Sequence, residues 1–235
     1  KSNDAGTALG RIAADTVVRI EIVDGASLDI PGLSGQVANV IAKVDALSGN
    51  WSWVPEFREN LQPSWFRGGV SANGKTEDGW SWSAQLNAQE IHNGHDGPGT
   101  ISDSAGNVLD ARREGFAGEG NEPDLAATLT YEAKDGAIAN MNLALRNLDF
   151  EGREHSFRSP VNGSPYSRIT GFGEEETGGE LRADCEFDFG PGRLKLIALH
   201  GYEEGDDLVT VEFYDDDGAY MSDTGQRVIE HAEEG

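Results

Sequence analysis

The chain has 235 residues, enough for one large β domain or two smaller domains. Its 42 acidic residues against 18 lysines and arginines give a formal net charge of −24, which disfavours electrostatic attraction to nucleic acid or to an anionic membrane surface. The single cysteine, Cys185, excludes an intramolecular disulfide and is interpreted as a small apolar side chain. The absence of an apolar run of about 18 residues excludes a transmembrane helix but not transmembrane strands, whose alternation averages to a hydrophilic score.

Two short strands are expected first. Residues 16–23 (TVVRIEIV) are rich in β-branched side chains and end at an Asp-Gly turn, as a buried strand does. Residues 26–35 read as a loop punctuated by proline and glycine, and residues 36–44 (QVANVIAKV) form an apolar run that is too short and too β-branched to favour a helix. We therefore expect residues 1–48 to belong to a small mixed α/β domain that begins before Lys1.

From Gly49 the sequence predicts antiparallel strands in a regular rhythm. About seven are expected, with an eighth starting near Arg227. They start near Gly49 and Trp65 and then cover about 80–89, 123–132, 137–150, 181–189 and 193–202. The turns NGKTEDG, KDG and GPG are short, whereas long loops are expected at about 90–122 and 151–178. Short turns at one end and long loops at the other are typical of an outer-membrane barrel.

Residues 80–89 (WSWSAQLNAQ) show a two-faced pattern, because alternate residues of a strand point to opposite faces. One face would carry Trp80, Trp82, Ala84, Leu86 and Ala88, and the other Ser81, Ser83, Gln85, Asn87 and Gln89. The apolar face must lie against a protein core or against lipid, and the periodicity alone leaves both open. The second face is polar but uncharged, which suits a barrel lumen better than the solvated outside of a β-sandwich.

Residues 17–44 resemble the end of the plug domain of TonB-dependent outer-membrane receptors. In that family an R-I-E-V strand leads to a glycine turn, and a later G-x-V-x-N-I segment closes the plug before the barrel begins. The matching positions are Arg19, Ile20, Glu21, Ile22, Val23 and Gly25, followed by Gly35, Val37, Asn39, Val40 and Ile41. The chain departs from the pattern at Asp24-Gly25-Ala26, where many members have Arg-Gly-Pro, and at Gln36, where a second glycine is common.

The resemblance implies that residues 1–48 are the C-terminal part of a plug domain and that residues 49–235 are the N-terminal strands of an outer-membrane β-barrel. The implied fold is mainly β, with antiparallel up-and-down strands of a large transmembrane barrel preceded by part of a small α/β plug. The barrel would be incomplete, since plugged transporters have about 22 strands. The side chains opposite Leu181–Phe189 would then line the lumen, namely Arg182, Asp184, Glu186 and Asp188.

The resemblance also implies a function and its partners. Such receptors take up a scarce solute, such as a ferric siderophore, a cobalamin or a glycan, across the outer membrane of a Gram-negative bacterium. An inner-membrane TonB complex supplies the energy by pulling on a periplasmic box near the receptor's N-terminus, and that box is missing from this sequence. The expected partners are the TonB complex, outer-membrane lipid and the solute, with no nucleic acid and no cofactor. The sequence does not identify the ligand-binding residues.

Two other sets of residues are candidate sites. His92, His95 and Asp96 could ligate a metal, but their spacing matches no specific zinc pattern. The acidic tract could hold calcium, although it does not match an EF-hand loop and a solvated loop is the simpler interpretation; it comprises Glu203, Glu204, Asp206, Asp207, Asp215, Asp216 and Asp217. No Ser/His/Asp set or carboxylate pair has a spacing that indicates catalysis, so no enzyme is expected.

Two rival classes remain beside the receptor. One is a secreted or surface-exposed all-β binding module that uses its acidic loops for calcium or carbohydrate. The other is a β-rich hydrolase, which would require a catalytic constellation that the sequence does not present. Folding in water without detergent would distinguish the binding module from the barrel.

Overall fold

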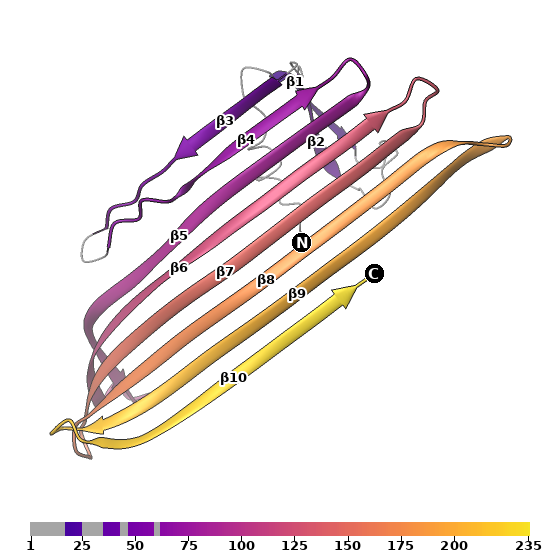
Figure 1. Cartoon of the computed structure of the whole chain (residues 1–235). Helices are drawn as coiled ribbons and strands as arrows, with labels where there is room; N and C mark the ends of the chain where they lie inside the picture. The colour runs from indigo at the N-terminus through magenta and orange to yellow at the C-terminus, as the bar shows by residue number, and fades with distance from the viewer. Residues whose placement is uncertain (1–16, 25–34, 43–46, 59–61) are drawn as a thin grey trace.

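The computed structural model describes residues 17–24, 35–42, 47–58 and 62–235. The regular elements in these ranges are all strands, so the described part of the chain is all-β. A two-stranded antiparallel sheet, β1-β2, precedes an eight-stranded antiparallel sheet in which each strand lies beside the next along the chain, from β3 to β10 (Figure 1). No helix in the described ranges could cross a membrane.

The strands differ greatly in length. The first four are short, and five of the last six have between 23 and 25 residues. Their bounds are β1 Val17–Asp24, β2 Gln36–Ala42, β3 Leu47–Trp53, β4 Gly68–Lys75, β5 Trp80–Ser102, β6 Val108–Glu132, β7 Ile138–Pro160, β8 Tyr166–Phe189, β9 Gly192–Asp215 and β10 Tyr220–Glu234.

The strands expected at the start of the chain are confirmed as β1 and β2. They pair antiparallel with Glu21 opposite Asn39, and the Asn39 amide donates a hydrogen bond of 3.4 Å to the Glu21 carboxylate. The helical component expected for residues 1–48 is not found in the described part of that range, where β-branched side chains favour strands. The turn at Gly25 lies outside the described residues.

The prediction of two long loops, at about 90–122 and 151–178, was wrong. These segments are the continuations of β5 and β6 and of β7 and β8. They pair residue by residue, for example at His92 opposite Glu119, with one register shift between Ile101 and Ser102 at the end of β5. Their content of Gly, Asn and Asp was typical of loops, but a backbone ladder overrides that weak local preference. The real connections are short, at residues 103–107 and 161–165. The contrast in connection length therefore disappears, while the three short turns are confirmed at one end of the sheet.

The number of strands agrees with the expected seven and an eighth, but the limits of the later strands needed correction. The sheet has eight strands, and β10 begins at Tyr220, before the expected start near Arg227. The segment expected to be an acidic loop after Tyr202 is the second half of β9. Trp65 lies in the connection before β4.

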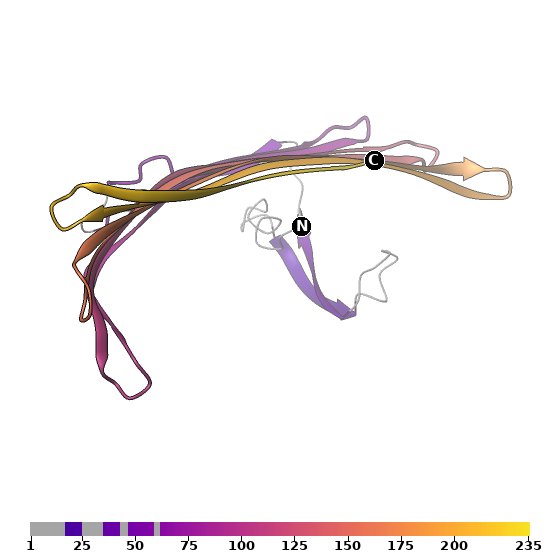
Figure 2. The same ribbon diagram turned by 90° about the horizontal axis from the view of Figure 1, so that it is seen from below.

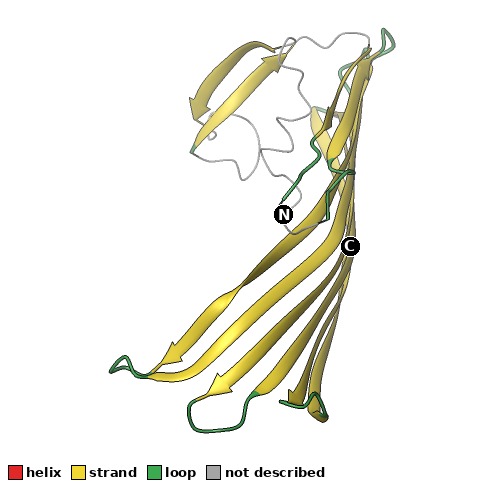
Figure 3. Ribbon diagram, turned by 90° about the vertical axis from the view of Figure 1, so that its left-hand side faces the viewer, coloured by secondary structure: helices red, strands yellow, loops and turns green. Residues whose placement is uncertain are grey.

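The eight-stranded sheet is a single curved layer that does not close into a barrel, so β3 and β10 are its open edges. The β1-β2 hairpin lies on the concave side of the curve (Figures 2 and 3). The ends of the long strands that are remote from the three short turns bend toward that same side (Figure 3). We call these remote parts the outer halves of the strands.

The backbone hydrogen bonds decide which side chains lie on which face. The Trp80 carbonyl accepts from the Thr76 amide at the β4 side of β5, and β4 lies to the right of β5 for a viewer of Figure 1 who follows β5 along the chain. In a strand of L-residues, a residue whose N–H and C=O groups point to the right of a viewer who follows the chain has its side chain pointing at that viewer. Trp80 and the residues of the same parity therefore point away from the hairpin, onto the convex face.

Candidate functional site: the two faces of the sheet

The convex face carries an apolar band near the short turns. In β5 and β6 it extends from the pair Trp80 and Tyr131 to the pair Ala88 and Pro123, a span of about 26 Å at the usual rise per residue. We define the apolar band by its members in the long strands, which are Trp80, Trp82, Ala84, Leu86 and Ala88 of β5, Pro123, Leu125, Ala127, Leu129 and Tyr131 of β6, Ala139, Met141, Leu143 and Leu145 of β7, Leu181, Ala183, Cys185, Phe187 and Phe189 of β8, and Leu194, Leu196 and Ala198 of β9.

The apolar band has no protein partner in the described part of the chain. No apolar side chain in that part is buried, and large ones remain open to the surroundings, such as Trp51 with 76%, Leu86 with 47% and Phe189 with 67% of its surface exposed. A soluble protein rarely leaves a contiguous apolar patch of more than a few hundred Å² uncovered. The band is therefore a contact surface for something outside the described residues.

The convex face becomes acidic immediately beyond the apolar band. One rung of paired residues across five strands contains four carboxylates, and its members are Glu90, Asn121, Asp149, Glu175 and Asp206. Burial alone would raise the pKa of Glu90, but the Ser64 hydroxyl and the Phe66 amide donate to its carboxylate and hold the pKa below its usual value. The pKa of Asp206 is lowered by its hydrogen-bonded ion pair with Arg227. The Glu90 and Asp206 carboxylates are thus charged near neutral pH.

The concave face opposite the apolar band is a network of small polar side chains. Asn87 donates to Asp124 at 3.1 Å, and Asn140 links Thr130, at 2.9 Å, to Asp184, at 3.0 Å. The other cross-strand hydrogen bonds of this face join Ser48 to Asn73, Ser71 to Asn50, and Thr128 to Asn142. The polar residues of WSWSAQLNAQ therefore face the side on which the hairpin lies.

The four charged residues expected to face a lumen lie on the concave face. Each has a charged partner within the sheet rather than a described partner in β1 or β2. Arg182 pairs with Glu180 at 2.7 Å, Asp184 with Lys195 at 3.7 Å, and Glu186 and Asp188 with Arg193 at 3.1 and 3.6 Å. Their contacts stabilise the sheet itself.

The outer half of the concave face holds a cluster of rings over glycines. Phe116 contacts Phe172 edge to face with ring centres 6.1 Å apart, and His95 stacks on Phe116 at 5.7 Å. A Cβ atom at Gly118 would lie 2.6 Å from the Phe150 ring, and one at Gly152 would lie 3.0 Å from the Phe116 ring. The glycines thus allow the rings to lie flat against the backbone where the sheet bends.

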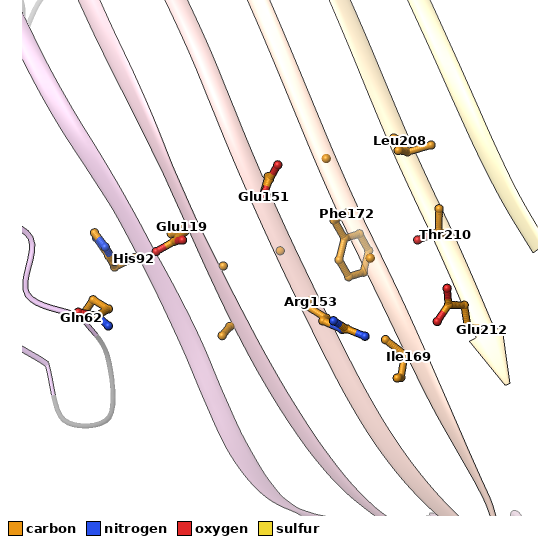
Figure 4. Close-up of a pocket in the computed structure, with 15 residues that line it drawn as sticks. Gln62, His92, Glu119, Glu151, Arg153, Ile169, Phe172, Leu208, Thr210 and Glu212 are labelled. Atoms are coloured by element: carbon orange, nitrogen blue, oxygen red, sulfur yellow. The ribbon is translucent and has the colours of Figure 1, made fainter. Parts of the chain in front are cut away.

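A hollow of about 670 Å³ lies on the convex face in the outer half of the sheet. Its side chains come mainly from β6 to β9, and Figure 4 shows Arg153 of β7 and Glu212 of β9 on the two sides of Ile169 of β8. Its floor contains Gly171 and Gly173, which add no side chain to this face. The sequence did not point to these residues, because they fall within or beside a segment expected to be a loop, and only the register of the long strands brings them together.

The candidate metal ligands are separated by the strands that carry them. His92 and His95 differ in parity on β5 and lie on opposite faces, so they cannot share an ion. In the acidic tract, Asp206 pairs with Arg227 and Glu203 with Arg146, at 2.8 Å in each case. The described residues contain no group of three or more His, Cys, Asp or Glu side chains arranged to hold a metal ion.

The residues that carry the plug resemblance lie in β1 and β2, apart from the two glycines. Arg19 pairs with Glu21 at 2.8 Å, and Ile20 lies opposite Val40. Val37, Asn39 and Ile41 lie on β2, and Gly35 precedes it with a φ of 79°, a left-handed conformation that favours glycine. Two of the motif's polar groups, Glu21 and Asn39, thus stabilise the hairpin directly.

Comparison with known proteins gave no match to a family model, to a curated protein or to a solved structure.

Proposed function

We propose that this chain is part of a TonB-dependent outer-membrane receptor, with β1 and β2 belonging to the plug and β3 to β10 to the wall of a transmembrane β-barrel. The apolar band then faces lipid and the concave face lines a lumen that contains the plug. Solute uptake would follow when ligand contacts bias the plug toward a state that an inner-membrane partner can pull open.

The observation that carries this proposal is an apolar convex face paired with a polar concave face in one unclosed layer. A transmembrane barrel strand needs about 9 to 11 residues to cross the bilayer, and its apolar band is about 25 Å tall. The span from Trp80 to Ala88, about 26 Å along the strand, is of this size. A β-sandwich would instead bury this face against a second sheet, and no second sheet covers it among the described residues.

The native cysteine allows a direct test of the lipid-facing assignment. Cys185 shares the convex face with Trp80, since both belong to the rung that contains Tyr131 and Ala139. We expect a bimane label on Cys185, in the full chain reconstituted into lipid vesicles, to be quenched by brominated lipids and protected from aqueous iodide.

The control moves the cysteine to the opposite face. In the variant Cys185→Ala/Ala144→Cys the label lies on the concave face, because Ala144 pairs with Ala126 and Glu180 on the polar side. It should be quenched by iodide and not by brominated lipids. Equal iodide quenching of both labels would overturn the proposal and favour a water-soluble β module.

A further inference from the structure

The hollow on the convex face holds unlike charges that do not pair with each other. No hydrogen bond or ion pair joins Arg153 to Glu212 in the described part of the chain, and Figure 4 shows the Ile169 side chain of β8 between them. The charge of Arg153 also acts on the hydroxyl of Tyr214. Arg153 lies opposite Gly171 and Glu212 opposite Ile169, so their backbones are two strands apart across the sheet and two residues apart along it, about 12 Å in all. The hollow therefore has a guanidinium on one side of β8 and a carboxylate on the other, with room for a ligand over Gly171 and Gly173 beside Ile169.

Small residues keep that space open. Gly171 lies opposite Arg153 on one side and Thr210 on the other, so the strand between the two charges adds no side chain at this rung. A Cβ atom at Gly171 would lie 2.7 Å from the Thr210 hydroxyl, well inside normal contact. Ala117, on the other side of Arg153, is also small. Any larger side chain at these positions would fill the hollow.

The carboxylate side of the hollow is held in place. The Tyr214 hydroxyl donates to Glu212 at 2.8 Å, and this hydrogen bond raises the pKa of Tyr214. Two further carboxylates, Glu119 and Glu151, lie directly opposite each other on β6 and β7 and also line the hollow. Like charges at directly opposed positions destabilise a sheet by themselves, and a cation would relieve this repulsion.

We propose that this hollow binds a small zwitterion, with its ammonium group on the Glu212 side and its anionic group at Arg153. Three carboxylates against one guanidinium favour a ligand that carries a positive charge, while that guanidinium offers paired N–H donors to a carboxylate or phosphate oxygen. Such a ligand could be a free solute or the head group of a lipid, because the hollow lies on the same face as the apolar band and beyond its outer limit. The inference concerns a site outside the lumen and does not depend on the proposed transport function.

Calorimetric titration of the full chain in detergent micelles with O-phosphoethanolamine tests the proposal. We expect saturable binding at least about tenfold tighter than that of ethanolamine or inorganic phosphate alone, since each of these engages only one charged group, and a lost charge-assisted hydrogen bond lowers affinity roughly ten- to a hundredfold. Micelles doped with phosphatidylethanolamine that compete with the free probe would assign the site to a lipid head group. Lack of competition would assign it to a free solute.

Variants of the two charges identify the site. Arg153→Gln and Glu212→Gln should each weaken O-phosphoethanolamine binding by about tenfold or more. The matched control is Arg113→Gln, on the same face, whose guanidinium already pairs with Asp96 at 3.1 Å and whose loss should leave the affinity unchanged. Exchanging the charges in Arg153→Glu/Glu212→Arg should restore binding lost in the single variants. Unchanged affinity in Arg153→Gln, or phosphate binding as tight as the zwitterion, would overturn the proposal.

Discussion

Two glycines of β6, Gly118 and Gly120, show how differently the same residue type is used on neighbouring rungs. Both lie on the concave face, yet a Cβ atom at Gly118 would meet the Phe150 ring at 2.6 Å, whereas one at Gly120 would meet the Asp149 carbonyl oxygen at 2.4 Å and the Phe150 Cα at 2.9 Å. A ring can rotate away from an added methyl group, but the backbone of a paired strand cannot.

We therefore predict that Gly120→Ala destabilises the protein by about 2 kcal/mol, and Gly118→Ala by less than about 1 kcal/mol, the range expected for overpacking that is relieved or not relieved by side-chain movement. Urea unfolding in detergent micelles, followed by circular dichroism, measures both. An equal loss of unfolding free energy in the two variants would contradict this prediction, because the β6 and β7 backbones would then accommodate a methyl group as readily as the Phe150 ring does.

At the residue scale, the sequence predicted on which face of a strand each side chain lies, but it did not predict which side chains come together across strands. The division of WSWSAQLNAQ into two faces is confirmed, because a period of two depends only on the strand geometry. Arg153 and Glu212 were not expected to approach each other, since their proximity depends on the register of three strands. No local pattern in residues 151–178 encodes that register.

At the scale of the strands, the two faces of β6 make a matched pair of positions available. Ala126 lies on the concave face between Gln85 and Ala144, and Ala127 lies in the apolar band between Ala84 and Leu143. The two alanines have the same size, the same strand and nearly the same depth, so they differ in little besides the face to which they belong.

We expect Ala127→Arg to lower the free energy of unfolding in lipid vesicles by about 2 to 4 kcal/mol, the cost of a guanidinium on a lipid-facing position near the bilayer midplane. Ala126→Arg should cost under about 1 kcal/mol, because its side chain reaches the polar concave face. Urea titration monitored by tryptophan fluorescence gives both values. Similar costs for the two variants would mean that neither face contacts lipid.

The same scale explains which elements were predictable. The apolar halves of β5, β6 and β8 alternate clearly, whereas those of β7 and β9 have mixed parity, and all five segments were predicted as strands. The outer halves contain glycine, charged residues and proline such as Pro98. Their strand structure comes from pairing with neighbouring strands, which for the outer half of β5 means β6 alone. A segment whose conformation comes from its neighbours carries little local signal, so the loops at about 90–122 and 151–178 were expected in error.

At the scale of the whole molecule, a single sheet exposes both an apolar band and acidic outer halves, and these two surfaces favour different surroundings. The sheet has no apolar core within the described residues, and its edges at β3 and β10 present unpaired backbone groups. The large excess of acidic residues favours hydration of the outer halves, but it does not cover the apolar band.

The full chain should therefore remain monomeric only when an amphiphile covers the apolar band. We predict that on removal of detergent it associates into large species, as seen by size-exclusion chromatography with light scattering. In micelles it should instead show a strand-rich circular dichroism spectrum. The association should persist at high salt, because apolar burial rather than charge pairing drives it. A monodisperse monomer with a cooperative melting transition in buffer alone would contradict the lipid-facing assignment, because some other part of the chain would then have to bury Trp80, Leu86 and Leu143.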